Sequence, residues 1–271
     1  MSRNGGSRRS NRSGASLPEV STIAAESSDP VVCEVRKPYL LGNSLTGGYG
    51  RGSDILHDCT IAVERGKIAV IVGPNGAGKS TAMKGLFGML DLRKGTVWLD
   101  DENITDLSPQ ARVAKGMAFV PQTSNVFTTM TVEENLEMGA FLHREGMKCA
   151  IEQVYGLFPV LRDRRRQRAG ELSGGQRQQL ALGRALMTQP QILMLDEVTA
   201  GISPIVMNEL FGKIIEIAGT GISVLMVEQN ARQALEIAHV GYVLVQGRNR
   251  FTDTGAALLA SPDVRRSFLG G

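Results

Sequence analysis

The stretch Gly73–Thr81, with the sequence Gly-Pro-Asn-Gly-Ala-Gly-Lys-Ser-Thr, constrains the fold of this chain more than any other feature. It fits the pattern G-x-x-x-x-G-K-S/T and lies between an apolar stretch over Lys67–Val72, which predicts a strand, and a helical stretch over Thr81–Leu90. Glycines here let successive backbone N–H groups turn towards a phosphate, and the start of the helix adds the positive end of its dipole. An ordinary glycine-rich turn is the alternative, but the flanking strand and helix favour a phosphate-binding loop.

Two residues of this loop have a predicted chemical role, and a second strand supplies two more. Lys79 is expected to reach the β- and γ-phosphates of a nucleotide, and the Ser80 hydroxyl is expected to ligate Mg²⁺. The strand Ile192–Leu195 leads into Asp196 and Glu197. Because adjacent carboxylates after a buried strand are costly without an ion or proton, we expect Asp196 to hold Mg²⁺ through water and Glu197 to polarise an attacking water. A solvent-facing acidic pair is the alternative.

The order of the expected elements predicts an α/β fold with a mostly parallel sheet covered by helices on both faces. With 271 residues, of which 42% are hydrophobic, the chain suits one large domain or a domain with an insert. Ser203 followed by Pro204 predicts the start of a helix, and the capping-box spacing of Thr131 and Glu134 predicts another from 132 towards 143. Strands are expected over 31–40, 58–63, 67–72, 192–196, 222–227 and 241–245, with helical segments filling about 105–190.

Residues 1–30 differ from the rest, because they are rich in serine, arginine and glycine and have almost nothing to bury. This composition predicts a disordered extension. A transit peptide is the alternative, but the amphipathic apolar face of such a segment is missing. From about Val31 onwards the pattern is globular.

Charge, cysteine content and hydropathy exclude several other classes of protein. The net charge of +3 is too small to demand nucleic acid as a partner, and the basic run Arg162–Arg168 is interpreted as a solvated face rather than a lipid or nucleic-acid contact. Cys33, Cys59 and Cys149 are odd in number and far apart, which favours a reducing compartment over a disulfide framework or a zinc site. No apolar run approaches the roughly 18 residues of a membrane span. We therefore expect a soluble chain that serves a membrane only through partners.

The motif Leu172-Ser-Gly-Gly-Gln176 separates this chain from other proteins with a phosphate loop. Ser173 and the amides of Gly174 and Gly175, at a helix N-terminus, form a second anion site. This site is too far along the chain to share the phosphate of the first without a fold-back. Two phosphate sites that face different ways suggest two chains that enclose nucleotide between them. With this motif the chain resembles the nucleotide-binding subunit of an ABC transporter, from about Val31 to the C-terminus.

The resemblance implies a fold, ligands and partners. The fold would be an ABC nucleotide-binding domain over 31–271, with an N-terminal antiparallel β subdomain and a helical subdomain inserted at about 122–188. The cofactors would be ATP and Mg²⁺. The partners would be a second ATPase subunit, identical or different, membrane permease subunits and, indirectly, a solute-binding protein, with no nucleic acid. The chain would lie in the cytoplasm on the inner face of the plasma (inner) membrane.

The resemblance also implies roles for individual positions. Tyr49 matches the aromatic residue that stacks on adenine, with a core or turn tyrosine as the alternative, and Gln122 matches the glutamine that senses Mg²⁺. The implied Mg²⁺ ligands are Ser80, Gln122 and Asp196. The implied ATP-binding residues are Gly73, Pro74, Asn75, Gly76, Ala77, Gly78, Lys79, Ser80 and Thr81, while Ser173, Gly174, Gly175 and Gln176 would bind the ATP held by the partner subunit.

Three departures from the broad family pattern point to one of its branches. Val198 follows Glu197 where proline is usual, Thr199–Pro204 replaces the commoner loop to the partner subunit, and Gln229 stands where most members have histidine. With the C-terminal Phe268-Leu-Gly-Gly271 and with Thr131–Leu136, these features resemble the LivF-type ATP-binding subunits of branched-chain amino acid importers, although Val198 is atypical even there.

Gln229 is expected to act with Glu197 in catalysis, as a neutral sensor of the γ-phosphate. Glu228 and Asn230 would be its flank and helix cap, and a bond to a strand-end backbone group is the alternative role. The expected function is ATP hydrolysis that drives import of branched-chain amino acids. A urea or amide importer is the alternative within the family. A non-transport ATPase that uses the nucleotide as a clamp is the alternative from another class of protein. The sequence argues against it, because such proteins usually carry two cassettes in one chain or a long coiled coil between the motifs, and neither is present in this sequence.

Overall fold

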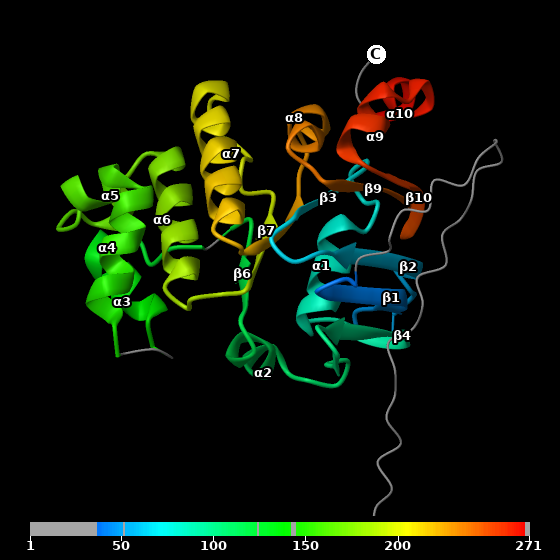
Figure 1. The fold of residues 1–271 in the computed structure, drawn as a ribbon, viewed down its shortest axis with the longest axis horizontal. Helices are drawn as coiled ribbons and strands as arrows, with labels where there is room; N and C mark the ends of the chain where they lie inside the picture. Colours follow the sequence, from blue (N-terminus) through cyan, green and yellow to red (C-terminus); the bar gives the residue numbers. More distant parts are fainter. Residues whose placement is uncertain (1–36, 51, 124, 142–144, 269–271) are drawn as a thin grey trace, which may run out of the picture.

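The computed structural model describes residues 37–268 apart from residue 51, residue 124 and residues 142–144. The extension predicted over residues 1–30, and most of the strand predicted over 31–40, lie outside the described residues. The described chain forms two β-sheets with helices between and around them (Figure 1).

In the described part of the chain, the larger sheet has six strands in the order β10-β9-β3-β8-β7-β6. Five of them pair in parallel, and β10 pairs antiparallel with β9. Every residue of β3, β7 and β8 is buried, which explains why these strands are nearly continuous apolar runs. The mostly parallel sheet predicted from the sequence is confirmed. Its strands are β3 (Ile68–Val72), β6 (Met117–Val120), β7 (Ile192–Asp196), β8 (Ser223–Val227), β9 (Val240–Val245) and β10 (Arg248–Asp253).

The smaller sheet is wholly antiparallel and has the order β2-β1-β4-β5. Its strands are β1 (Leu40–Gly48), β2 (Leu56–Val63), β4 (Asp91–Leu99) and β5 (Glu102–Asn103). The N-terminal antiparallel sheet of the expected α/β fold is therefore present.

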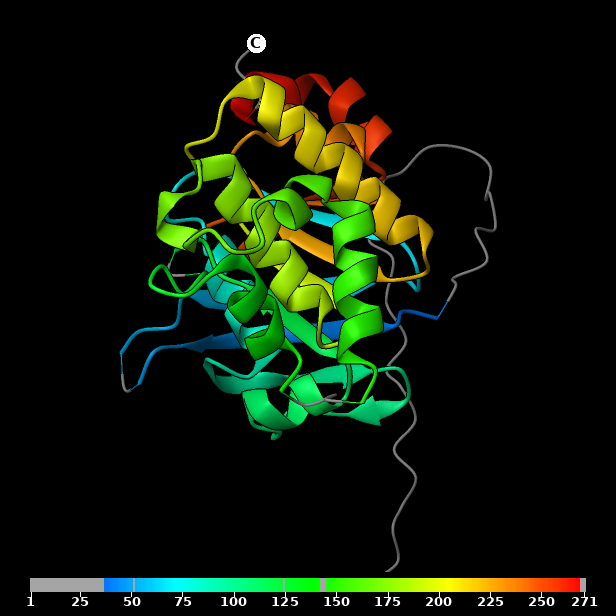
Figure 2. The same ribbon diagram turned by 90° about the vertical axis from the view of Figure 1, so that its left-hand side faces the viewer.

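The helices fall into three groups (Figures 1 and 2). Helix α1 (Lys79–Phe87) contacts strands of both sheets, and α2 (Pro109–Ala114) precedes β6. A bundle at one side of the molecule lies in the chain between β6 and β7 and contains α3 (Val132–Gly139), α4 (Met147–Leu157), α5 (Pro159–Asp163), the short 3₁₀ helix η1 (Ala169–Glu171) and α6 (Gly174–Leu186). The remaining helices are α7 (Pro204–Gly219), α8 (Ala231–Glu236), α9 (Gly255–Ala260) and α10 (Pro262–Phe268).

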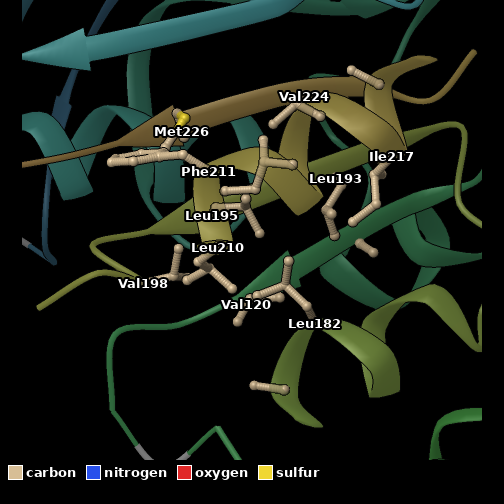
Figure 3. Packing of buried hydrophobic residues seen from close by; sticks show 14 of the residues in the cluster. Val120, Leu182, Leu193, Leu195, Val198, Leu210, Phe211, Ile217, Val224 and Met226 are labelled. Carbon is tan, nitrogen blue, oxygen red and sulfur yellow. The ribbon is translucent and has the colours of Figure 1, made fainter. Parts of the chain in front are cut away.

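The larger sheet separates two hydrophobic cores, because successive side chains of a strand point to opposite faces. Leu193, Leu195, Val224 and Met226 pack on one face against α7 (Figure 3). Their neighbours in sequence, Ile192, Met194, Leu225 and Val227, pack on the other face with Met83 and Leu86 of α1. The helix that follows the phosphate loop is thus fixed between both sheets.

Two side chains of the β9–β10 hairpin bind the free edge of β2. Asn249 accepts a hydrogen bond from the Thr60 N–H through Oδ1 (2.8 Å) and donates one to the Thr60 carbonyl through Nδ2 (2.8 Å). The Tyr242 hydroxyl accepts from the Ala62 N–H (2.9 Å) and donates to the Ala62 carbonyl (2.8 Å). The turn of the same hairpin donates from the Gly247 N–H to the carbonyl of Ala77 in the glycine-rich loop (2.9 Å). The hairpin therefore joins the two sheets beside that loop.

Several sequence predictions of local structure were wrong. The region expected to be helical over about 105–190 contains β6, a buried strand of four residues that is too short to show a period of its own. The strand predicted over 31–40 is wrong in its described part, because residues 37–39 lie outside any strand and β1 begins only at Leu40. β4, β5 and β10 were not predicted, since they lie in the smaller sheet or at an edge and carry many exposed polar residues. The helix N-terminus expected at Ser173 is present, because a capping box of Ser173 and Gln176 starts α6 at Gly174 despite two glycines.

Candidate functional site

The predicted phosphate loop leads from β3 directly into α1. Gly78, at φ +92, is the N-cap residue of α1, and this left-handed conformation favours glycine. Pro74, Asn75 and Gly76 at the tip are exposed, whereas Ala77, Gly78, Lys79 and Thr81 are buried. The Lys79 ammonium donates to the carbonyls of Gly73 (3.0 Å) and Pro74 (3.2 Å). The loop thus holds a buried positive charge at the N-terminus of a helix, which is the arrangement that binds phosphate.

Ser80 and Asp196 meet beside this loop. Asp196 is the last residue of β7, and its Oδ1 accepts a hydrogen bond of 2.7 Å from the Ser80 hydroxyl. The two residues are 116 positions apart in sequence, so the parallel sheet brings them together. Two of the three residues predicted to ligate Mg²⁺ are therefore in direct contact.

Three loops converge on the carboxylate of Glu197. The Oε2 atom of Glu197 accepts hydrogen bonds from Nε2 of Gln122 (2.8 Å) and from Nε2 of Gln229 (2.7 Å). Gln122 follows β6, Glu197 follows β7 and Gln229 follows β8, and these are adjacent parallel strands. The carboxyl ends of parallel strands lie at one edge of the sheet, which is where such folds bind ligands.

Glu197 itself has a strained backbone, with φ +50. Its N–H donates to the Val227 carbonyl (2.9 Å), and its carbonyl accepts from the Ala200 N–H (3.1 Å). Strain of this kind at a non-glycine residue persists only where the surroundings hold it, and such positions cluster at functional sites.

The donor set of this site fits a divalent cation that prefers oxygen ligands. Asp196 and Glu197 are only 5% and 8% exposed, and neither forms an ion pair among the described residues. Within the same part of the chain, no group of three or more His, Cys, Asp or Glu residues is arranged to hold a metal. A Ser hydroxyl with one or two carboxylates is the protein contribution expected for Mg²⁺, whose remaining ligands are water and phosphate.

Residues 173–176, the predicted second anion site, lie at the start of α6. Ser173 Oγ accepts from the Gln176 N–H (3.3 Å), and Gln176 Oε1 accepts from the Ser173 N–H (3.0 Å). Ser173 and Gly174 are exposed. A Cβ at Gly175 would lie 2.3 Å from Cγ1 of Val206 in α7, so a glycine is also needed there for packing. No hydrogen bond between residues 173–176 and residues 73–81 occurs in the described structure.

Tyr49 follows β1 and is 48% exposed. Its ring centroid lies 5.9 Å from the Lys84 ammonium, on the helix that begins at the phosphate loop. The exposed ring is available to a ligand near α1, which excludes a core tyrosine, while the alternative of a turn tyrosine stays open.

Asn230 and Val198 lie next to the site residues Gln229 and Glu197. Asn230 was predicted to cap α8, but its side chain forms no capping hydrogen bond. Its Nδ2 donates to Sδ of Met207 (3.2 Å) instead. Val198, which replaces a usual proline, is fully buried and packs with Leu210 in the core (Figure 3).

The buried contact between Thr199 and Glu228 was missed by sequence reasoning. Glu228 was expected only to flank Gln229, yet its carboxylate accepts from the Thr199 N–H (3.3 Å) and from the Thr199 hydroxyl (2.5 Å). Burial raises the pKa of Glu228 to about 7, against the hydrogen bonds of Thr199 and Gln229, and the charge of Glu197 raises it further. Residues 29 apart give no local signal of such a pair.

Fold and site together define a P-loop nucleoside triphosphatase, with its phosphate loop and acidic pair at the carboxyl edge of a mostly parallel sheet. Residues 56–200, more than half of the chain, match the ABC transporter family, and the chain belongs to this family. It is therefore an ABC-type ATPase that binds nucleotide, a kind of subunit that works with membrane permease components. None of the helices in the described ranges combines the length and the apolar character needed to cross a membrane.

Named relatives and a solved structure are similar over most of the chain. The chain is 43% identical over 217 residues to the high-affinity branched-chain amino acid transport ATP-binding protein BraG of Pseudomonas aeruginosa, covering 80% of this chain and 93% of BraG. It is 40% identical over 228 residues to the probable branched-chain amino acid transport ATP-binding protein LivF of Archaeoglobus fulgidus, covering 83% and 96%. The ADP conformation of an ATP-binding cassette of an ABC transporter superposes with a TM-score of 0.75 at 27% identity, covering 87% of this chain and 100% of that one.

Proposed function

We propose that this chain is the ATP-hydrolysing subunit of an importer of branched-chain amino acids. The names of BraG and LivF support the class of solute. The observation that carries the catalytic part of the proposal is the convergence of Gln122 and Gln229 on Glu197.

Nucleotide binding is assigned to the loop over residues 73–81 and to Tyr49. The backbone N–H groups of the loop and the Lys79 ammonium bind the phosphates, because they present positive charge at the start of α1. The exposed ring of Tyr49 stacks on the adenine.

Hydrolysis is assigned to Glu197, whose two carboxylate oxygens have different surroundings. Oε2 is held by two amides, while Oε1 accepts no hydrogen bond from the described residues and is free to orient a water. An amide nitrogen carries two N–H groups, so Gln229 keeps one for a γ-phosphate oxygen while the other binds Glu197. This arrangement positions the attacking water and neutralises charge that develops on the phosphate.

Mg²⁺ is assigned to Ser80, Asp196 and Gln122. Gln122 donates its Nε2 to Glu197, which leaves its Oε1 as an oxygen ligand. These residues would hold the cation, which would supply positive charge that stabilises the negative charge of the phosphates.

A second ATPase subunit completes the site. Ser173, Gly174, Gly175 and Gln176 of one subunit bind the γ-phosphate held by the other. The capping box uses the N–H groups of Ser173 and Gln176, so the start of α6 offers the anion the N–H groups of Gly174 and Gly175 and the Ser173 hydroxyl. The chain is placed at the inner face of the membrane by permease subunits that receive solute from a solute-binding protein. The same relatives do not favour a urea importer or a non-transport clamp.

The catalytic assignment is tested by Glu197→Gln in the complex with its partner subunits. ATP hydrolysis should fall by about 10²-fold or more with ATP binding retained, because the phosphate loop stays intact while the carboxylate is lost. Glu216→Gln is the matched control, since Glu216 is exposed and forms a surface ion pair with Lys213, away from Glu197 in sequence. Wild-type turnover by Glu197→Gln would remove Glu197 from the mechanism.

The class of solute is tested with the reconstituted importer in vesicles. Leucine, isoleucine or valine should stimulate ATP hydrolysis in the presence of the solute-binding protein, whereas urea should not. Stimulation by urea or a short amide alone would exclude the proposed solute class while leaving the ATPase assignment in place.

A further inference from the structure

The turn that carries Glu197 is bonded to a second buried carboxylate, that of Glu228. Thr199 and Glu228 are 2% and 1% exposed, so their contact is shielded from solvent. Both oxygens of the Glu228 carboxylate are used on one residue, Oε1 by the Thr199 N–H and Oε2 by the Thr199 hydroxyl. This bidentate contact fixes the backbone of Thr199 and its rotamer together.

The backbone of Glu228 is anchored on the strand that leads into the phosphate loop. Its N–H donates to the carbonyl of Ile71 in β3 (3.2 Å), two residues before Gly73. Thr199 lies inside the turn closed by the bond from the Ala200 N–H to the Glu197 carbonyl. The Glu228 residue therefore connects the strand before the phosphate loop to the strained turn at Glu197.

An apolar residue would fill this position at lower free energy if packing were its only role, because burial of a carboxylate opposes ionisation. Glu228 also lies beside Gln229, whose amide binds Glu197 directly. The segment after β7 and the segment after β8 are thus joined by two contacts. One is between Glu197 and the exposed Gln229, and the other is between the buried Thr199 and Glu228.

We propose that the Thr199–Glu228 pair positions the carboxylate of Glu197 relative to the phosphate loop, with Glu228 and Thr199 acting as positioning residues that do not touch the nucleotide. This inference rests on the role proposed above for Glu197. Loss of the pair lets the turn relax from its positive φ and moves the carboxylate away from the water it orients.

The test compares Thr199→Val, which removes the hydroxyl at constant shape, with Thr199→Ser, which keeps it. In the assembled complex, Thr199→Val should lower kcat by about tenfold and change KM for ATP by less than about twofold, because positioning of the water is lost and binding is not. Thr199→Ser should recover most of kcat. Glu228→Leu should resemble Thr199→Val, and the double variant should lose little more, since both residues serve one contact.

Thr220→Val is the matched control. Thr220 donates a hydrogen bond to the Ile217 carbonyl (2.7 Å) at the end of α7, away from the turn, so this variant should keep the wild-type kcat. Equal losses in Thr220→Val and Thr199→Val would overturn the proposal, as would a wild-type kcat in Thr199→Val.

Hydrogen exchange distinguishes failure of this inference from failure of the proposed function. Amide exchange in a peptide over residues 197–203 should be faster in Glu228→Leu than in the wild type, and unchanged in Thr220→Val. If the wild-type complex hydrolyses no ATP, the proposed function fails, and the exchange rates still report whether the pair holds the turn. Unchanged exchange in Glu228→Leu would overturn the inference even in an active complex.

Discussion

Gln122 and Gln229 show how a neutral side chain serves two partners at once. Each donates one amide hydrogen to Oε2 of Glu197 and keeps one further N–H and its carbonyl oxygen for the nucleotide or its cation. Both glutamines are exposed, while Glu197 is buried between them. The two glutamines therefore lie between the buried carboxylate and the solvent-facing side of the proposed nucleotide site.

Removal of the Gln229 amide gives a prediction at this scale. Gln229→Ala should lower hydrolysis by roughly tenfold with ATP binding largely kept, because a hydrogen bond to a charged group is lost that strengthens at the transition state. Gln229→His should stay active and gain a pH dependence near the imidazole pKa of about 6.5. Steady-state ATPase rates with the partner subunits present check both variants.

Gln233→Ala is the control for that series. Gln233 lies on α8 and donates to Asn208 at an exposed position, so its loss should leave the rate unchanged. An alanine variant at 229 that is as fast as the wild type would leave Gln229 with a structural role only.

Glu228 predicts a pH dependence of stability. Burial raises its pKa to about 7, so the folded state binds the proton more tightly than the unfolded state. Its contribution to stability is then fully present below the ordinary carboxyl pKa and is lost as pH rises through about 7. As the pH rises from about 5 to about 8, the free energy of unfolding of the wild type should fall relative to that of Glu228→Gln. Denaturant titrations across that range measure this difference, and parallel curves for the two proteins would contradict it.

The β9–β10 hairpin is the element that ties the smaller sheet to the larger one. Asn249 satisfies both backbone groups of Thr60, and Gly247 reaches the phosphate loop at Ala77. Asn249→Ala should lower the free energy of unfolding by about 1 to 3 kcal/mol, because the Thr60 N–H and carbonyl lose their partners. Asn208→Ala, at an exposed position on α7, is the control. Thermal or denaturant unfolding checks the change, and equal stability of the two variants would show that solvent replaces Asn249.

Some strands of the larger sheet could be predicted from the sequence and others could not. β3, β7 and β8 were predicted because strands buried on both faces are short apolar runs, and Lys79, Ser80 and Asp196 were predicted because their motifs adjoin those strands. β6 and β10 were missed, since one is very short and the other is an edge strand with exposed polar residues. The position of Gln122 beside Glu197 depends on β6, so only the family resemblance indicated it.

Contacts between distant residues set the limit of sequence reasoning for the whole molecule. The Thr199–Glu228 pair and the Asn249–Thr60 pair arise from the order of strands in the sheets, which no local pattern specifies. The packing of Gly175 on Val206 is of the same kind, because a motif residue assigned to anion binding also meets a helix that follows thirty residues later in the chain.

One prediction concerns the chain as a whole. Residues 1–30, which lie outside the described residues, lack apolar periodicity. Their deletion should leave ATP hydrolysis and the melting temperature nearly unchanged, because such a sequence offers little to bury against the folded part. Calorimetry and ATPase rates of the truncated chain check this, and a clearly lower melting temperature would show that the segment packs on the domain.

The edge of β2 has a further consequence for how this molecule behaves among its own copies. An unpaired strand edge is a template on which another chain can add a strand, and this is a common route to strand exchange and aggregation. At Thr60 and Ala62 that template is closed, because Asn249 and Tyr242 occupy both the donor and the acceptor of each residue. At these two residues the side chains of Asn249 and Tyr242 take the place of a neighbouring strand, so this part of the β2 edge offers no free backbone groups to another molecule.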